Sequence, residues 1–359
     1  MLNYRRSALL TFLAIPLGIL AERNFRKLPR LPVSRVPSYQ PSLSIIIPAR
    51  DEAHNLGVIL PSLLNIDYPG EQQILVVDDH SSDNSAQVAE TFGVQLLSLV
   101  EDLPQNWKGK PYTCHQGAMV AKGEWLLFTD ADTIHSRLGI SSAVAYAVAN
   151  KLDGLSLFIK HQNLSWIDGI TLDVAFAGLF SGWSAANHML NGQFILVRRE
   201  VYFDSGGFAA VGNEVLEDVA LGNWLQSRGY RLQLLAGDQV ARVHMYASQK
   251  QMFYGLTRLG AGSLRWQGLR AVLTALHITA IMSPLVALLG GLLGKLSWFW
   301  VPATWSVSSL SILPWSRRSA NSFQALFAPL GALIVLVASL FGLINRLSRK
   351  GIPWKGRRV

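Results

Sequence analysis

The stretch from Gly123 to Asp132, GEWLLFTDAD, restricts the fold of this chain more than any other segment. Trp125–Thr129 is short, apolar and aromatic, which is typical of a buried strand. The strand leads into Asp130 and Asp132, whose side chains point to the same side if the backbone stays extended. Two such carboxylates repel each other unless a hard divalent cation lies between them. Because open α/β sheets bind ligands beyond the carboxyl ends of their strands, the stretch predicts a metal and a phosphate-bearing ligand. The alternative is a polar turn that only ends a strand, since D-x-D alone is a weak signal.

Strands and helices alternate before this stretch. Apolar runs predict strands at Leu43–Ile47, Ile74–Val77 and Val94–Leu97, with helices at Ala53–Leu64 and Ser85–Phe92 between them. This order indicates a parallel sheet with right-handed crossovers. Polar residues follow the first two strands, at 48–52 and 78–83, where a ligand would bind. The chain contains neither G-x-G-x-x-G nor G-x-x-x-x-G-K-[ST], so dinucleotide cofactors and P-loop ATP hydrolysis fit poorly.

The composition indicates a protein with membrane segments. Half of the 359 residues are hydrophobic, 15% are charged, and the single Cys114 excludes an internal disulfide framework. Of the net charge of +9, residues 1–40 carry +6 and residues 265–359 carry +11, so the part between them is acidic, at −8. The basic charge flanks apolar segments, which favours the cytoplasmic face of an anionic bilayer as the partner and not nucleic acid.

Four apolar runs lie at the two ends of the chain. The N-terminal run, Ser7–Ala21, would span about 22 Å as a helix, so we expect a short anchor or an interfacial helix. The other runs are Val272–Leu293, Trp298–Leu313 and Ala325–Ile344, of which the middle one is marginal in length. We therefore expect three parts: an anchor and basic linker at 1–40, an α/β domain at 41–265, and membrane-associated helices with a basic tail at 266–359.

Five segments occur in a recognisable order: IIIPARDE, VVDDHSSD, DLPQNWKGKPYTCHQGA, GEWLLFTDAD and LEDVALGNWL. Together they resemble the inverting, family-2 nucleotide-sugar glycosyltransferases over about residues 41–265. The resemblance implies a GT-A fold, which is a Rossmann-like α/β domain with a mostly parallel sheet. Within this family, W-x-G-K followed by CHQGA, with WKGR near the C-terminus, resembles the membrane-bound enzymes that glycosylate carotenoids and related polyisoprenoids.

The resemblance also implies a donor site. Its nucleotide-sugar-binding residues would be Pro48, Ala49, Arg50, Glu52, Asp78, Asp79, Lys110 and Asp130. Asp132, with Asp130, would ligate a divalent metal, Mg²⁺ or Mn²⁺, that neutralises the leaving diphosphate. The alternative for Asp78 and Asp79 is that they cap the following helices, and for Lys110 that it belongs to a solvated loop. Lys108 is expected to face solvent, and whether His244 ligates the metal stays open.

The acceptor side follows from the same resemblance. Asp218 matches the catalytic base, which takes the proton of the acceptor hydroxyl, although Asp also caps helix N-termini well. The other residues expected on this side are Asn191, Gly192, Gln193, Glu217, Arg265 and Trp266. Processive relatives carry Q-x-x-R-W, but Gly262 stands here in place of the Gln. This departure favours transfer of a single sugar.

The predicted activity is transfer of one sugar from a UDP- or GDP-linked donor to a lipid-soluble hydroxyl, such as that of a carotenoid. The catalytic domain would then be cytoplasmic, at the cell (inner) membrane, in a multi-pass protein. Because the basic tail should also be cytoplasmic, an even number of crossings must separate the two, and the sequence leaves open which apolar run does not cross. One alternative is transfer to a polyprenyl phosphate. Another is a transporter or channel with a nucleotide-sensing domain, which the absence of Asp, Glu and Lys from the apolar runs disfavours.

Overall fold

A seven-stranded sheet forms the centre of the α/β part of the chain. The computed structural model describes residues 4–33, 40–162, 165–183, 190–246, 248–267, 269–319, 321–348, 353–354 and 357–358. The strand order is β3-β2-β1-β4-β8-β6-β9. The strands are β1 (Leu43–Ala49), β2 (Gln72–Asp78), β3 (Gln95–Ser98), β4 (Trp125–Phe128), β6 (Gly154–Phe158), β8 (Ile195–Arg198) and β9 (Leu232–Ala236). Only β8 runs antiparallel to its neighbours, β4 and β6, so the predicted mostly parallel sheet is confirmed.

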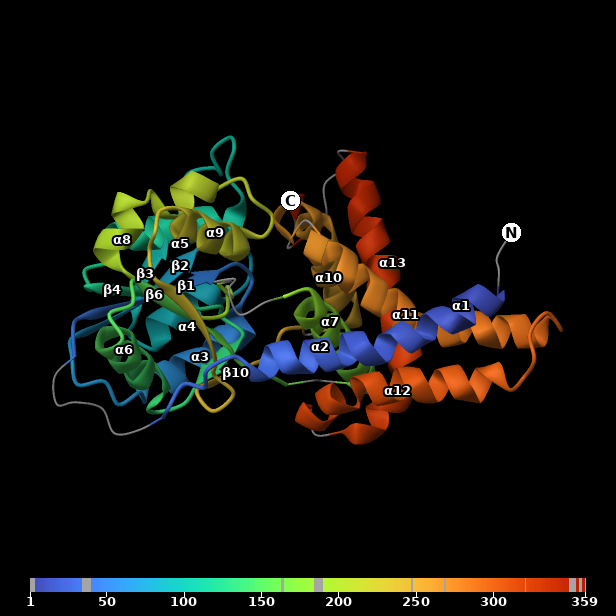
Figure 1. Cartoon of the computed structure of the whole chain (residues 1–359). Helices are drawn as coiled ribbons and strands as arrows, with labels where there is room; N and C mark the ends of the chain where they lie inside the picture. The colour runs from blue at the N-terminus through green and yellow to red at the C-terminus, as the bar shows by residue number, and fades with distance from the viewer. Residues whose placement is uncertain are drawn as a thin grey trace.

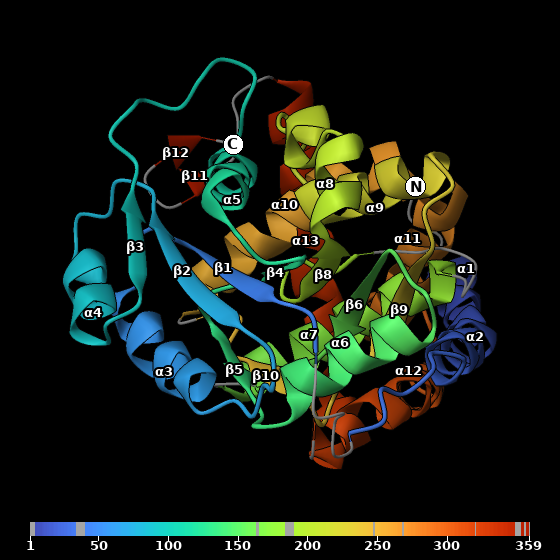
Figure 2. The same ribbon diagram turned by 90° about the vertical axis from the view of Figure 1, so that its left-hand side faces the viewer.

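Helices cover both faces of this sheet (Figure 2). One face carries α3 (Ala53–Leu64), α4 (Ser85–Thr91) and α6 (Gly139–Ala149), and the other carries α5 (Gly109–Val120), α8 (Arg199–Asp204), η2 (Gly207–Val211) and α9 (Glu217–Ser227). In β1, Ile45 and Ile47 pack with the first group while Ile46 packs with the second. Because both faces are covered, Ile45–Ile47 in β1 form a continuous apolar run that does not alternate with polar residues.

The acidic stretch differs from the prediction in one respect. Strand β4 ends at Phe128, and residues 130–132 form a turn that the bond from Thr133 N to Asp130 O (3.2 Å) closes. The expectation of extended backbone through Asp132 is therefore wrong. A second, three-stranded sheet follows at once, in the order β5-β10-β7, with β5 (Thr133–His135), β10 (Ala241–Val243) and β7 (Lys160–His161). It brings the segment after β10 next to the acidic turn.

A layer of helices packs beside the α/β part, to its right in Figure 1. Its members are α1 (Tyr4–Leu10), η1 (Thr11–Leu13), α2 (Ala14–Arg26), α7 (Trp166–Gly182), α10 (Gln249–Gln267), α11 (Leu269–Leu292), α12 (Trp300–Arg318), η3 (Ser322–Phe327) and α13 (Ala328–Leu347). Two short strands, β11 (Pro353–Trp354) and β12 (Arg357–Arg358), pair near the C-terminus. Helix α7 packs against α2, α11 and α13, so the layer draws on all three predicted parts of the chain.

Three helical segments are long and apolar enough to cross a membrane, by length and composition: Tyr4–Arg26, Arg270–Leu292 and Ser322–Leu347. The first is longer than the predicted 15-residue anchor, because the helix continues through the charged residues at both ends of the apolar run. With 23 residues the whole helical segment spans about 34 Å, compared with about 22 Å for the apolar run alone.

Candidate active site

A cleft of about 670 Å³ opens at the carboxyl ends of β1, β2 and β4, a size typical of sites for small ligands. Most residues predicted for the donor and the metal line it, namely Pro48, Ala49, Arg50, Glu52, Asp79, Lys110, Asp130 and Asp132. Glu217 and His244 line it as well, and so does Lys108, which we had expected to face solvent. Asp78 is buried and does not line it; its side chain accepts a hydrogen bond from the Ser81 hydroxyl.

The loops after β1 and β2 are tied together across this cleft. The guanidinium of Arg50 donates to the carbonyl oxygen of Asp79 (2.9 Å) and lies 3.8 Å from its carboxylate. Asp83, and not Asp78 or Asp79, accepts from the backbone N–H of Ala53 at the start of α3 (3.0 Å). The helix-capping alternative therefore applies to Asp83, while the carboxylate of Asp79 stays at the cleft wall.

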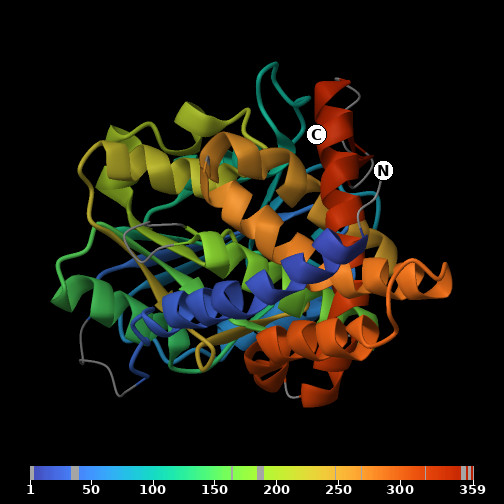
Figure 3. The same cartoon turned by 45° about the vertical axis from the view of Figure 1, so that its right-hand side comes forward.

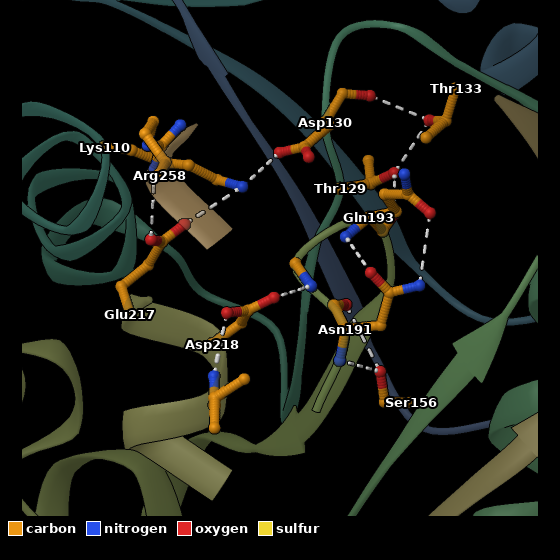
Figure 4. Close-up of polar contacts among 12 residues, drawn as sticks. Lys110, Thr129, Asp130, Thr133, Ser156, Asn191, Gln193, Glu217, Asp218 and Arg258 are labelled. Carbon is orange, nitrogen blue, oxygen red and sulfur yellow. Dashed lines mark hydrogen bonds and ion pairs between the residues drawn. The ribbon is translucent and has the colours of Figure 1, made fainter. Parts of the chain in front are cut away.

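Lys110 is the charged centre of the cleft (Figure 4). Its ammonium lies 2.6 Å from Asp130 Oδ1 and 3.2 Å from Glu217 Oε1, and Arg258 Nη2 lies 3.7 Å from Glu217 Oε2. Burial by itself would lower the pKa of Lys110, but the carboxylates of Asp130 and Glu217 hold that pKa well above its ordinary value. Burial would likewise raise the pKa of Glu217, but Lys110 and Arg258 lower it. Lys110 and Glu217 therefore both stay charged at neutral pH.

Asp218 is oriented by two backbone N–H groups. Gly192 donates to its Oδ2 (2.8 Å) and Val219, in the first turn of α9, donates to its Oδ1 (2.8 Å). The second bond is a helix-terminal one, as the capping alternative expects, but the first joins Asp218 to the Asn191–Gln193 turn on the predicted acceptor side. Burial and the neighbouring charge of Glu217 raise the pKa of Asp218 to about 6. A carboxylate with this pKa is suited to accept a proton near neutral pH.

A buried chain of hydrogen bonds joins the acidic turn to the turn that orients Asp218 (Figure 4). The hydroxyl of Thr129 donates to the Gln193 carbonyl (2.9 Å) and lies 3.0 Å from His135 Nε2. Thr133 donates to the carbonyl oxygen of Asp130 (2.8 Å). Burial lowers the pKa of His135 to about 4, so its ring is neutral, and with Nε2 protonated it donates to Thr129. Each hydroxyl then has an acceptor for its single proton.

The Asn191–Phe194 turn is anchored at several points. Phe194 N donates to the Asn191 carbonyl (2.9 Å), and the Asn191 amide donates to Leu157 O (2.9 Å) and to Gln193 Oε1 (3.1 Å). A Cβ atom on Gly192 would lie 2.8 Å from Lys110 Nζ and 3.2 Å from Asp218 Oδ2. A side chain at this position would therefore displace the Lys110 ammonium from between the carboxylates that it contacts.

Arg258 is the residue that the sequence did not indicate. It reaches the cleft from α10, together with Gln251 and Tyr254. The predicted Arg265 lies seven residues, about two helical turns, further along the same helix. The side chains of Arg265 and Trp266 lie outside the described part of the structure. The sequence did contain one signal for Arg258, because it is a basic residue two helical turns before the expected Arg265 on the same amphipathic helix.

The acidic turn supplies oxygen ligands of the kind that Mg²⁺ and Mn²⁺ prefer. The carboxylates of Asp130 and Asp132 both line the cleft. Across the described ranges, no group of three His, Cys, Asp or Glu side chains forms a metal-binding cluster. Two carboxylates supply fewer oxygen ligands than these ions take, so a metal held by Asp130 and Asp132 would need further ligands from outside this pair.

Comparison with known proteins agrees with the fold. The model of the glycosyl transferase family 2 matches residues 44–219, which contain β1 to α8 and the start of α9. The 4,4'-diaponeurosporenoate glycosyltransferase of Staphylococcus aureus (strain USA300) is 27% identical over 222 residues. The match covers 57% of this chain and spans only 56% of the length of that relative.

A solved structure shares the fold over nearly the whole chain. It is a mannosyltransferase from Pyrobaculum calidifontis in complex with GDP-mannose and Mn²⁺. It is similar to 94% of this chain and 99% of its own, with a TM-score of 0.63 and 18% sequence identity. At this identity the similarity establishes the fold, helical layer included, and does not transfer the donor or the metal.

Proposed function

Since this chain belongs to glycosyl transferase family 2, with the family domain at residues 44–219, we propose that it transfers a single sugar from a UDP- or GDP-linked donor to a lipid-soluble hydroxyl. One observation carries the proposal. A single charged network, through Lys110 and Glu217, brings the acidic turn next to the helix end that holds Asp218. In this proposal the donor side and the acceptor side meet at that network.

We assign the donor to the edge of the sheet at β1, β2 and β4. The loop 48–52 and Asp79 would enclose the nucleoside, since they line the cleft side by side. Lys110 lies in the first turn of α5, where backbone N–H groups and the helix dipole also favour a diphosphate. Asp130 and Asp132 would hold the divalent metal, which when bound neutralises charge on the leaving diphosphate.

We assign the role of general base to Asp218. Two backbone donors fix its carboxylate, and the raised pKa makes it a stronger base than an ordinary Asp. As the acceptor oxygen attacks the anomeric carbon, Asp218 would take its proton, and the configuration would invert. Glu217 is less suited to this role, because two cations lower its pKa.

The acceptor is proposed to be a carotenoid or a related polyisoprenoid with a hydroxyl group. The relative from Staphylococcus aureus is named for a carotenoid-type carboxylate, diaponeurosporenoate, so it supports the polyisoprenoid class of the acceptor and not its hydroxyl group. The helical layer suits an acceptor that resides in the bilayer. A polyprenyl phosphate would need cations on the acceptor side. Arg258 lies 3.7 Å from the carboxylate of Glu217 there, which favours a neutral acceptor. The protein would sit in the cell membrane with the cleft on the cytoplasmic side, where nucleotide sugars are made.

Binding and transfer, measured separately, test this function. Asp218→Asn should still bind a labelled UDP- or GDP-sugar in detergent, while transfer to carotenoid acceptors falls by roughly 10²–10⁴-fold. Asp132→Asn should lose the part of donor binding that depends on Mn²⁺ or Mg²⁺. Asp204→Asn removes an exposed carboxylate far from the cleft and serves as the matched control. Normal transfer by a folded Asp218→Asn variant would mean that Asp218 only caps the helix. If the wild-type protein transferred sugar from none of the tested donors, the proposed function itself would be contradicted.

A further inference from the structure

We infer that α1–α2, α11 and α12 cross the bilayer as one bundle, whereas α13, the most apolar of the candidate spans, lies in the plane of the inner leaflet. The inference rests on the proposed membrane function and goes beyond it, because it assigns each helix its path. It also reverses the order that hydropathy suggests, since α12 is not among the three segments selected by length and composition.

Contacts along their length show that α1–α2, α11 and α12 lie side by side with roughly parallel axes. At the end far from the sheet, the Lys295 ammonium lies 5.8 Å from the Tyr4 ring centroid, and Gly290 packs closely against the same ring. Halfway along, the hydroxyls of Thr11 and Ser283 are hydrogen bonded. At the near end, Arg318 binds Glu22 through two hydrogen bonds of 2.6 and 2.7 Å. Thus α12 runs parallel to α1–α2, and α11 runs antiparallel to both.

The charged residues of this bundle lie at its two ends. The interiors 7–21, 271–294 and 296–316 contain no Asp, Glu, Lys or Arg. Arg5, Arg6 and Lys295 mark the far end, and the near end carries more basic residues: Arg23, Arg26, Lys27, Arg270, Arg317 and Arg318. The helices of 23, 24 and 19 residues span about 28–36 Å, which matches a hydrocarbon core of about 30 Å. The larger basic cluster belongs on the cytoplasmic side, next to the cleft domain.

Helix α12 has a lower mean hydropathy than α11 and α13 because it carries several hydroxyl side chains. These side chains face the bundle and not lipid. Thr304, Ser308 and Ser311 are buried, and the Ser308 hydroxyl donates to Ile281 O on α11 (2.9 Å). A Cβ atom on Gly18 of α2 would lie 2.9 Å from Ser311 O, so these two helices are in backbone contact. Small and hydroxyl residues at such interfaces are the usual means by which membrane helices pack.

Helix α13 runs across this bundle and not along it, as Figures 1 and 3 both show. Its small residues pack on α7 and α10: a Cβ on Gly331 would lie 2.5 Å from Ile170 O, and one on Gly260 of α10 would lie 2.5 Å from Ser339. The opposite face is a continuous exposed apolar stripe of Leu330, Leu333, Val337, Leu340, Phe341, Ile344 and Leu347. A helix crosswise to the spanning bundle can bury such a stripe only by lying within one leaflet.

This arrangement gives the even number of membrane crossings that is required between the catalytic domain and the basic C-terminal tail. From the cytoplasmic cleft domain, α11 leads out and α12 leads back, so α13 and the basic tail stay on the cytoplasmic side. Because α13 packs on α10, and α10 carries Gln251, Tyr254 and Arg258 at the cleft, the cleft lies at the surface of the inner leaflet. Only the head group of a lipid acceptor then has to leave the inner leaflet to enter the cleft.

Site-directed cysteine labelling tests the path of the full-length chain. The buried Cys114 is replaced by Ser, and single cysteines replace Ser297, Asn321 and Ser348, which lie before α12, before α13 and after α13. A membrane-impermeant maleimide is applied to intact spheroplasts and to inverted membrane vesicles. Ser227→Cys, an exposed position on α9, marks the side of the cleft domain. We expect Ser297→Cys to react only from the side opposite to Ser227→Cys, and Asn321→Cys and Ser348→Cys only from the same side as Ser227→Cys.

Two results would overturn the inference. Labelling of Asn321→Cys and Ser348→Cys from opposite sides would make α13 a spanning helix. Labelling of Ser297→Cys from the same side as Ser227→Cys would mean that α11 and α12 do not cross as a pair. Phe323→Cys, also exposed, replaces Asn321→Cys if that position does not react after solubilisation. Transfer activity is assayed on the same membranes, so a failed function and a failed topology are read separately.

Discussion

At the scale of single residues, the ionisation of Asp218 is expected to set the pH dependence of transfer. Burial and Glu217 raise its pKa to about 6. A general base accepts a proton only when it is ionised, so kcat/KM, which reports the ionisation of the free enzyme, should fall as the pH drops below about 6 and reach a plateau above it. The measurement is kcat/KM against pH. A profile with no inflection near that value would show that proton transfer to Asp218 does not limit the reaction.

The hydroxyl of Thr129 is expected to fix the position of the turn at Asn191–Gln193 relative to the acidic turn at 130–132. Thr129→Val keeps the shape but leaves the Gln193 carbonyl without its donor, a loss of about 1–3 kcal/mol for a buried group. Because Gln193 adjoins Gly192, which orients Asp218, we expect kcat to drop about tenfold or more, with little change in donor affinity. The matched variant Thr129→Ser retains the hydroxyl and should retain most of the activity.

The ratio of transfer to acceptor-independent donor hydrolysis, measured in one sample, separates this role from simple destabilisation. A smaller folded fraction lowers both rates equally, whereas a misplaced Asp218 lowers transfer more. An unchanged ratio in Thr129→Val would assign Thr129 a structural role only.

At the scale of elements, the contact between α13 and α7 depends on Gly331. A Cβ atom there would lie 2.5 Å from the carbonyl oxygen of Ile170, which is backbone and cannot rotate away. We expect Gly331→Ala to destabilise the protein by about 1–3 kcal/mol, as overpacking does, and to lower Tm in detergent. Gly57→Ala in α3 is the control, since nothing lies within 4 Å of its added methyl group. It should instead raise stability by about 0.5–1 kcal/mol, and equal effects of both variants would contradict the packing described for α13.

At the scale of the whole molecule, the α/β part and the helical layer are expected to fold as one unit. Helix α7 belongs to the chain of the α/β part, but most of its residues are buried, with Val174 and Ala177 in one apolar cluster with Ile278 and Ala332. A chain that ends at Gln267 would expose this helix. We therefore expect the truncated protein to sediment without detergent, and a soluble, monomeric fragment that binds donor would show that the two parts are independent.

The sequence by itself determined the first four strands of the sheet, β1 to β4, and most of the cleft edge at their carboxyl ends. Buried strands can be recognised from local apolar runs in the sequence, and in a parallel sheet their carboxyl ends lie at one edge. Residues that directly follow strands, such as Arg50, Asp79 and Asp130, were therefore predictable as neighbours although they lie far apart in the chain. The helix at Ala53–Leu64 was predicted with its observed bounds for the same reason, because its periodicity is local.

Only the tertiary structure decided which distant side chains meet. Arg258 reaches Glu217, and Thr129 bonds to a carbonyl 64 residues away, because the helical layer and the strand order bring these segments together. Neither partner is encoded in the type of the residue or in its spacing. The same holds for the serines of α12, which are polar residues within an apolar run and face other helices once packed. Hydropathy measures what a residue would prefer to contact, and only packing determines what it contacts.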